Sequence, residues 1–261
     1  MRFFFYCLVF QCALFATVNE PLRWEIFSGY RNDRIHWHIQ DPGTPPTLNF
    51  SELFRDVEYW INGLTLKVIH RDLSFFLRGA YGTFGTSAIT SSGWTADASG
   101  YFGYAVNLTA GRLYKVILTP LIGYSGYFEE LRRSGGAGTF RQVWNGFFFG
   151  GQFSFETMGP VILTAGYAYN LMHNRVHTVF FNPNRQSLKT SSGGNGGQTG
   201  WASIEWKLKS LWCLGLGAEI QYFSTRVVDA SISSAGRGDF SQKFKLRWTP
   251  VSGWGQISRQ F

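Results

Sequence analysis

The sequence has few charged residues, because Asp, Glu, Lys and Arg make up only 15% of the 261-residue chain. Soluble domains have about 25% charged residues. Aromatic residues reach 18%, and glycine occurs 31 times. A chain with so little charge is poorly suited to meet water on all sides, which disfavours an ordinary soluble domain and favours contact with lipid.

Long hydrophobic runs are also missing outside the N-terminus, and this excludes a bundle of transmembrane helices, each of which needs about 20 apolar residues. At the N-terminus, Arg2, the apolar stretch 3–15 and the small residue Ala16 have the order of a signal peptide. An N-terminal membrane anchor is the alternative. The sequence predicts a signal peptide over residues 1–16 and a single exported domain over residues 17–261.

Cysteine is scarce. Cys7 and Cys12 fall within the predicted signal peptide, so Cys213 is left alone and an internal disulfide or a cysteine zinc site is excluded. No segment calls for a cofactor. The formal net charge is +8, and for an exported chain we expect this basic excess to meet lipid or glycolipid headgroups rather than nucleic acid.

A period of two in hydrophobicity runs through the chain and is typical of β-strands. The segment 201–209 carries Ala202, Ile204, Trp206 and Leu208 on one face and Ser203, Glu205, Lys207 and Lys209 on the other. Similar alternation predicts ten strands, near residues 22–38, 51–69, 73–86, 99–109, 113–128, 140–155, 160–175, 200–209, 211–227 and 240–249. The apolar face changes parity within 22–38 and at Asn62-Gly63. We interpret the change at Asn62-Gly63 as a bulge, and a tight hairpin there is the alternative.

The connections between these strands alternate in length. Short turns are expected near 70–72, 109–112, 156–159 and 209–211, and long loops near 40–50, 87–98, 129–139, 176–199 and 228–239. Short turns on one rim with long loops on the other are typical of outer-membrane barrels, which must close so that no sheet edge meets lipid. The predicted fold is an all-β, transmembrane, antiparallel up-and-down barrel of about ten strands. A secreted sandwich or lipocalin-like barrel is the soluble alternative.

The alternation also predicts which side chains face the lumen and which face lipid. The predicted lumen-facing polar residues are Arg78, Asn107, Glu205, Lys207, Glu219, Gln221, Lys245 and Arg247. The predicted lipid-facing aromatic residues are Tyr114, Tyr124, Tyr167, Trp206, Trp212, Tyr222 and Trp248. The terminal Phe261 and the row Phe244, Leu246 and Trp248 are similar to the C-terminal signal read by the barrel-assembly machinery, which makes that machinery an expected partner.

Two short motifs suggest chemistry. His70-Arg71-Asp72-Leu73 matches part of a kinase catalytic loop, but Leu77 replaces the Asn that would hold a metal ion. His36 and His38 lie two residues apart and could chelate a metal, although no Cys completes the set. We interpret the first motif as a turn before a strand and the second as ordinary polar residues at the rim.

The ten strands and the segment 59–85, YWINGLTLKVIHRDLSFFLRGAYGTFG, resemble the omptin outer-membrane barrels. Residues 27–39, 52–57 and 76–85 also resemble outer membrane proteins of environmental chlamydiae. Omptins are proteases with an Asp-x-Asp pair and an Asp-x-His pair, which the resemblance would place near 87–98 and 174–199. The first segment contains only Asp97 and the second contains no Asp.

These features together predict a non-enzymatic barrel in the outer membrane of a Gram-negative-type bacterium, exported by its signal peptide. We expect an envelope-structural role or the binding of a host or surface ligand through long extracellular loops. A narrow porin-like pore is the first alternative. An omptin-related protease or another outer-membrane hydrolase is the second.

Overall fold

The computed structural model describes residues 22–40, 57–84, 90–109, 114–133, 138–180, 186–208, 211–234 and 238–260. The predicted signal peptide and Phe261 lie outside these residues. Within them, no helix is long and apolar enough to cross a bilayer. The strands are β1 (Leu22–Gln40), β2 (Val57–His70), β3 (Leu73–Phe84), β4 (Thr90–Tyr104), β5 (Val106–Asn107), β6 (Tyr114–Arg133), β7 (Gly138–Thr157), β8 (Val161–Phe180), β9 (Gln186–Lys207), β10 (Trp212–Ser224), β11 (Val228–Ser234) and β12 (Gly238–Gln260).

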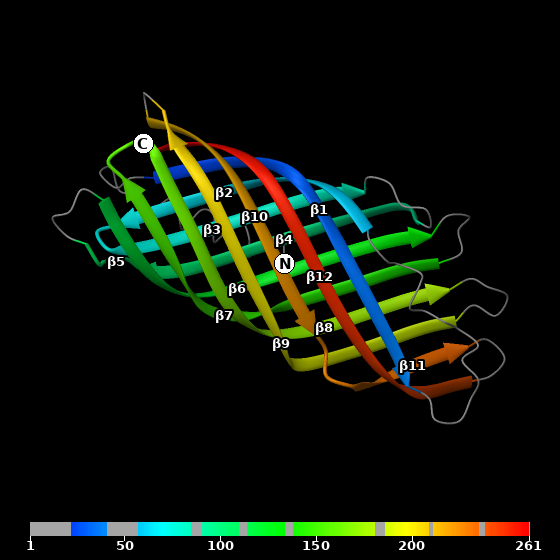
Figure 1. Ribbon diagram of the computed structural model, residues 1–261. Helices are drawn as coiled ribbons and strands as arrows, with labels where there is room; N and C mark the ends of the chain where they lie inside the picture. The colour runs from blue at the N-terminus through cyan, green and yellow to red at the C-terminus, as the bar shows by residue number, and fades with distance from the viewer. Residues whose placement is uncertain are drawn as a thin grey trace.

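The strands form one closed antiparallel barrel, as the sequence predicts (Figure 1). Neighbours in the chain are neighbours in the sheet, and β1 pairs with β12 to complete the ring. The short strands β5 and β11 extend β4 and β10 along β6 and β12. The circumference of the barrel therefore consists of ten strands, and its architecture is that of an outer-membrane β-barrel.

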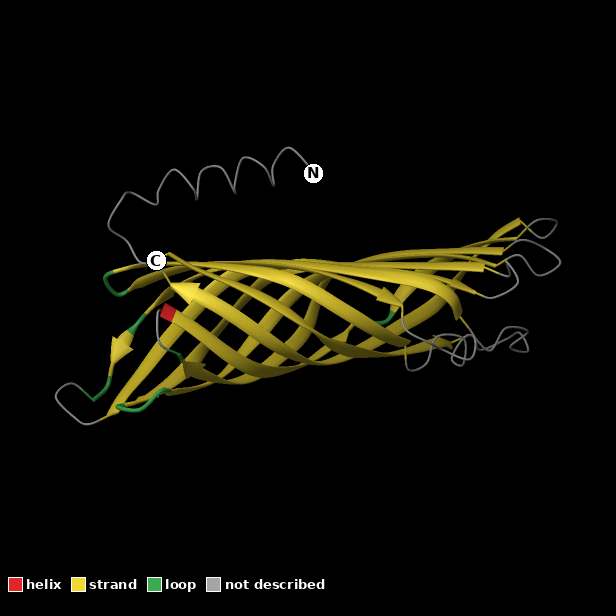
Figure 2. Cartoon of the chain, turned by 90° about the horizontal axis from the view of Figure 1, so that it is seen from above, coloured by secondary structure: helices red, strands yellow, loops and turns green. Residues whose placement is uncertain are grey.

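The barrel is long, since β6, β7 and β8 each contain 20 residues and β12 contains 23. About 9–11 residues per strand are enough to span a bilayer. Figure 2 shows this elongated shape, with β12 ending at the same end of the barrel as the short turns. That turn end includes the two-residue turn Arg71-Asp72, where the sequence predicts a turn. We call the opposite end the outer end.

The predicted long loops at the outer end are wrong for most of their residues. β4 begins at Thr90, β6 runs to Arg133, and β8 and β9 include most of the segment 176–199. Residues 228–234 form β11, and β12 already begins at Gly238. The Gly- and Ser-rich composition of these segments was misleading, because strands that rise above a membrane need an apolar face only toward the interior and tolerate Gly and Ser on the face in water. Residues 41–56 lie outside the described residues.

Next to the turn end, the outer surface of the barrel is an apolar band. Its members are exposed side chains from neighbouring strands, and they include Ile26, Leu64, Leu73, Phe102, Ile122, Phe149, Leu163, Leu216, Ile220, Val251 and Ile257. Aromatic side chains lie near both margins, including Tyr104, Tyr114 and Trp206 at the turn end and Tyr30, Trp60 and Tyr222 toward the outer end. Such a band with aromatic margins matches the hydrocarbon layer of a bilayer.

Beyond this band the two faces of each strand exchange character. On β12, Val251 and Ile257 face outward within the band, whereas Phe244 and Leu246 are completely buried inside the outer part of the barrel. Lys243 lies on the outer surface there. Water surrounds the wall above a membrane and the interior is the core, so the apolar residues change sides while the strand continues.

This exchange accounts for both changes of parity and corrects the predicted bulge at Asn62-Gly63. β1 and β2 pair in continuous register from Leu22↔Val68 to Asp33↔Val57, and β2 passes straight through Asn62 and Gly63. No hairpin forms there. The change of apolar parity in each segment marks the upper margin of the band, with no extra residue in the strand.

Three predicted orientations are wrong for the same reason. Trp248 is 1% exposed and lies inside the barrel, and Lys245 and Arg247 lie on the outer surface. The predicted alternation is correct, but in this outer part of the barrel the apolar face points to the interior and the polar face points to water. Residues 250–260, which lie beyond the predicted end of the last strand at 249, continue β12 and pair with β1 and β10.

An aromatic plug fills the interior at the middle of the barrel, consisting of Tyr127, Trp144, Phe223 and Trp248. The Phe223 and Trp248 rings are stacked with centroids 5.3 Å apart, and Trp144 lies 5.5 Å from Phe223. Tyr127 lies 5.3 Å from Phe223 and 5.6 Å from Trp248. Further apolar side chains, among them Trp37, Phe140 and Phe244, continue this core toward the outer end.

Buried polar groups beside the plug are paired with one another. Arg31 donates two hydrogen bonds of 2.6 Å to Asp33, and the indole of Trp248 donates one of 3.1 Å to the same carboxylate. Tyr59 donates to Glu129 at 2.6 Å across the interior, and Gln142 donates to the other oxygen of Glu129. These bonds join β1, β2, β6, β7 and β12, so the core is fixed by directional contacts as well as by packing.

We expect Trp248→Ala to lower the free energy of unfolding by about 3–5 kcal/mol, because it leaves a cavity in the packed core. Urea-induced unfolding in lipid vesicles measures this. The control Val251→Ala removes an exposed apolar side chain three residues away and should cost less than about 1 kcal/mol. Equal effects of the two substitutions would contradict an interior position of Trp248.

Candidate functional site

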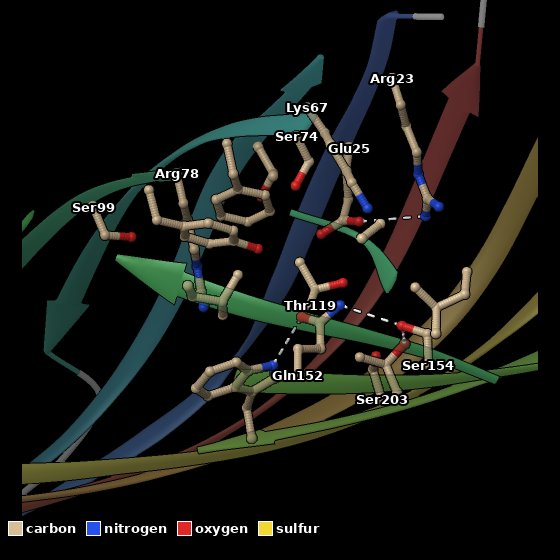
Figure 3. Close-up of a pocket in the computed structure, with 18 of the residues that line it drawn as sticks. Arg23, Glu25, Lys67, Ser74, Arg78, Ser99, Thr119, Gln152, Ser154 and Ser203 are labelled. Atoms are coloured by element: carbon tan, nitrogen blue, oxygen red, sulfur yellow. Dashed lines mark hydrogen bonds and ion pairs between the residues drawn. The ribbon is translucent and has the colours of Figure 1, made fainter. Parts of the chain in front are cut away.

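A cavity of about 480 Å³ occupies the lumen between the turn end and the plug (Figure 3). It begins among exposed residues at the turn end, including Arg71, Asp72 and Lys115, and reaches Tyr127 of the plug. The wall consists of inward-facing residues from almost every strand. Its volume falls within the range of small-molecule sites in proteins, about 300–1,000 Å³.

One wall of the cavity carries a cluster of charges from β1, β2, β9 and β12. Arg23 donates a hydrogen bond of 2.7 Å to Glu205 and lies 3.6 Å from Glu25. Gln256 donates to both carboxylates, at 3.1 Å to Glu25 and 3.2 Å to Glu205. Lys67 lines the same wall. The strand period of two places these groups together, since Arg23 and Glu25 are both inward-facing residues of β1.

A second charged group lies deeper, just below the plug. Arg78 donates to Glu219 at 3.1 Å, and its guanidinium lies against two neighbouring rings, 4.6 Å from the centroid of Phe27 and 4.8 Å from that of Trp254. Gln221 donates to both Glu219 and the hydroxyl of Tyr127. Two cation–π contacts, together with an ion pair, hold Arg78 in one position.

The facing wall is neutral and rich in hydroxyl groups. Gln152 accepts a hydrogen bond of 3.3 Å from the indole of Trp201 and donates one of 3.3 Å to Ser154, which contacts Thr164 at 3.4 Å. Ser203 lies beside them in Figure 3. Trp201 fits here because Gly166 has no Cβ, which would otherwise come within 2.2 Å of the indole.

Arg78, Glu205, Glu219 and Gln221, which the sequence singles out as lumenal, all face the interior. Asn107 lines the cavity at its exposed mouth. Lys207 lies at the same end, where it pairs with Glu156 at 3.6 Å. The structure thus brings four of the candidates into the two charged groups and places two at the mouth. Lys245 and Arg247 lie on the outer surface.

Six of the seven aromatic residues singled out as lipid-facing lie on the outer wall. Tyr114, Tyr124, Tyr167, Trp206 and Tyr222 are exposed within the apolar band. Trp212 lies on the same face and contacts Trp24 edge to face, with centroids 5.5 Å apart. Trp248 alone lies inside the barrel.

His36 lies on the outer surface opposite Arg247 of β12, and the side chain of His38 lies outside the described residues. In the described part of the chain, no group of three or more His, Cys, Asp or Glu side chains could hold a metal ion. The pairing of His36 with an arginine is unfavourable to a cation site.

Much of the cavity wall is formed by residues that the sequence patterns did not indicate, namely Arg23, Glu25, Lys67, Trp201 and Trp254. The parity of strands 22–38 and 51–69 was unassigned, so their inward faces could not be identified. A usable signal was present: Thr65 and Lys67 alternate with Leu64, Leu66 and Val68. Trp254 lay beyond the predicted end of the last strand.

Above the apolar band, basic side chains gather on the outer wall. This basic collar consists of Arg34, His36, Arg132, Arg141, His173, Arg175, His177, Lys189, Lys243, Lys245 and Arg247. Glu130 contacts Arg141 at 2.7 Å and Arg132 at 3.2 Å, and Asp229 contacts Lys243 at 2.9 Å. Lys189, Lys245 and Arg247 make no ion pair with any residue that the structure describes.

Comparison with known proteins gives a likeness of fold. The outer membrane protease OmpT from Escherichia coli superposes with a TM-score of 0.68 and 9% sequence identity, covering 94% of this chain and 99% of OmpT. The translocator domain of the autotransporter NalP from Neisseria meningitidis covers 96% of this chain and 92% of that domain at 14% identity, with a TM-score of only 0.44. No family model and no curated protein matches the chain.

The OmpT likeness supports the omptin-like barrel that the sequence resembles, and it extends over nearly the whole length of both chains. At 9% identity it is a statement about the fold alone. The resemblance to chlamydial proteins has no counterpart among these structures and stays a prediction.

We expect Glu205→Gln to reduce the free energy of unfolding by about 1–3 kcal/mol, because Arg23 loses its shortest charged contact in a largely enclosed site. Urea-induced unfolding is the measurement. Glu156→Gln is the matched control, since its 3.6 Å contact with Lys207 is half exposed and should contribute about 1 kcal/mol or less. A larger loss for Glu156→Gln than for Glu205→Gln would refute the ranking.

Proposed function

We propose that this chain is an integral outer-membrane protein of a Gram-negative-type bacterium, without enzymatic activity, which stabilises the envelope by binding anionic glycolipid around its wall. One observation carries the proposal: a basic collar directly above an apolar band. On β12, Lys243, Lys245 and Arg247 follow Val251 along the same face. A lipid with acyl chains and phosphates matches both parts of such a surface.

The spacing of the collar strengthens this proposal. Arg141 lies opposite His177, and His177 lies opposite Lys189, in three neighbouring strands. His36 and Arg247 form a similar pair across β1 and β12. A phosphate between such a histidine and its basic neighbour would accept hydrogen bonds from both side chains.

The surface-binding part of the proposal rests on the strands that rise above the band. In the part of the chain that the structure describes, they present a wall of paired strands where the sequence suggested long loops, so contact with a host or surface ligand would use the sides of this extension. The barrel-assembly machinery remains a proposed partner. Phe261 lies outside the described residues, and Trp248 belongs to the plug, so recognition would use the outer face of β12, where Val251 and Ile257 are exposed.

The interior disfavours the two alternatives. The aromatic plug fills the cross-section that a narrow pore would need. The single carboxylate at the first position implied by the omptin resemblance, Asp97, lines the space beside Arg78 and Glu219 below the plug. An omptin-type site on the rim is therefore a poor description of it.

We expect the triple variant Lys243→Gln, Lys245→Gln and Arg247→Gln to bind lipid A about tenfold or more weakly, given about 1 kcal/mol per basic residue near an anionic surface. Anisotropy of fluorescent lipid A, titrated with refolded protein in detergent, measures the affinity. The control removes Lys115 and Lys207 at the turn end and should leave it unchanged. Wild-type protein that does not bind lipid A, or equal losses in both variants, would refute the proposal.

The position of the plug in the lumen has a consequence for ion conductance. In planar bilayers we expect the wild-type barrel to give no ion conductance, because the plug and the apolar core that continues it toward the outer end fill the lumen. Tyr124→Ala, Tyr167→Ala and Tyr222→Ala on the outer wall should give none. Conductance in the wild-type protein would favour the pore instead.

A further inference from the structure

One cation deep in the lumenal cavity, Lys67, makes no direct contact with a carboxylate in the described part of the chain. Three of the carboxylates that line the cavity, Glu25, Glu205 and Glu219, each contact an arginine or a glutamine instead. Lys67 lines the cavity beside Glu25 and Arg23, as Figure 3 shows. Among the residues that the structure describes, its ammonium makes neither a hydrogen bond nor an ion pair. Glu25 and Glu205 attract Lys67 only without direct contact, so its ammonium is open to a direct contact with an incoming anion.

The facing wall offers a different chemistry. Gln152, Ser154 and Thr164 present an amide and two hydroxyls, groups that both donate and accept hydrogen bonds. The Trp201 indole lies next to them and is tied to Gln152. Planar polar groups beside an aromatic ring suit a sugar, because the C–H face of a sugar ring is apolar and its edge is covered with hydroxyls.

The cavity is accessible from one end only. Arg71, Asp72, Asn107 and Lys115 are exposed where it begins. Toward the outer end, Tyr127 and the rest of the plug close it. A ligand must therefore enter between the short turns, and the about 480 Å³ available limits it to the size of a monosaccharide or a small disaccharide.

We propose that the lumen binds a small sugar acid that carries one carboxylate. The carboxylate pairs with Lys67, the sugar ring packs near Trp201, and hydroxyls exchange hydrogen bonds with Gln152, Ser154 and Thr164. This binding site is separate from the basic collar, so the inference does not depend on glycolipid binding.

Three probes separate the parts of this proposal. D-glucuronate and D-glucose differ in one carboxylate, and acetate has the carboxylate without the ring. Ligand-observed NMR titrations with the full refolded barrel in detergent should show glucuronate binding about tenfold or more tightly than either other probe, the contribution of one added charged contact. This comparison uses the unmodified protein. Equal affinity for acetate would overturn the sugar, and no saturable binding of glucuronate would overturn the site.

Variants locate the binding. Lys67→Gln should weaken glucuronate binding about tenfold and leave glucose unchanged, whereas Lys245→Gln on the outer wall should leave both unchanged. Ser203→Trp fills the cavity and should abolish binding of glucuronate. Heat-modifiable gel migration verifies that each variant is folded. Glucuronate binding that survives in folded Lys67→Gln or Ser203→Trp protein would overturn the assignment.

Discussion

The pairing of β1 with β12 is the constraint on which the rest of this structure depends. It runs in one register from Arg23↔Gln260 to Gln40↔Lys243, along almost the whole of β1. Without it, two strand edges would present unpaired amide and carbonyl groups to hydrocarbon, at a cost of several kcal/mol for each group. Closure also creates an inside and an outside. This division decides which side chains meet lipid or water and which line the interior.

The closed wall separates three environments along each strand. The apolar band meets lipid, the space below the plug holds a cavity lined by charges and hydroxyls, and the outer part has a dry core with a charged exterior. Arg31 and Asp33 illustrate the boundary. They lie in the packed region beside Trp248, and their mutual hydrogen bonds supply what water would supply lower in the barrel. The plug therefore both closes the lumen and stabilises the outer extension.

Much of this fold could be predicted from alternation alone. The segments around Trp206 and Ile220 have clear periods of two, and the ten segments of this kind predict a ten-stranded barrel. The lumenal position of Arg78 and Glu219 follows from their parity. The outer half could not be predicted in the same way. The prediction assumed lipid outside and polar groups inside along each whole strand, so Trp248 was assigned to lipid, Arg247 to the lumen, and the parity change at Asn62-Gly63 to a bulge. Composition was equally misleading at residues 186–199, because strands with water on one side tolerate Gly and Ser.

The exchange of faces has a consequence for how firmly each strand is aligned with its neighbours. A shift of β12 by one residue against β1 would turn Lys245 and Arg247 into the dry core and, at the other end of the same strand, Ser252 and Gln256 into the hydrocarbon. Both errors arise together, in two different media, from a single slip. Two independent energetic costs, one in the core and one in the lipid, therefore oppose a slip of β12 against β1. This allows the barrel to be long and rich in glycine and still pair its strands in a single register.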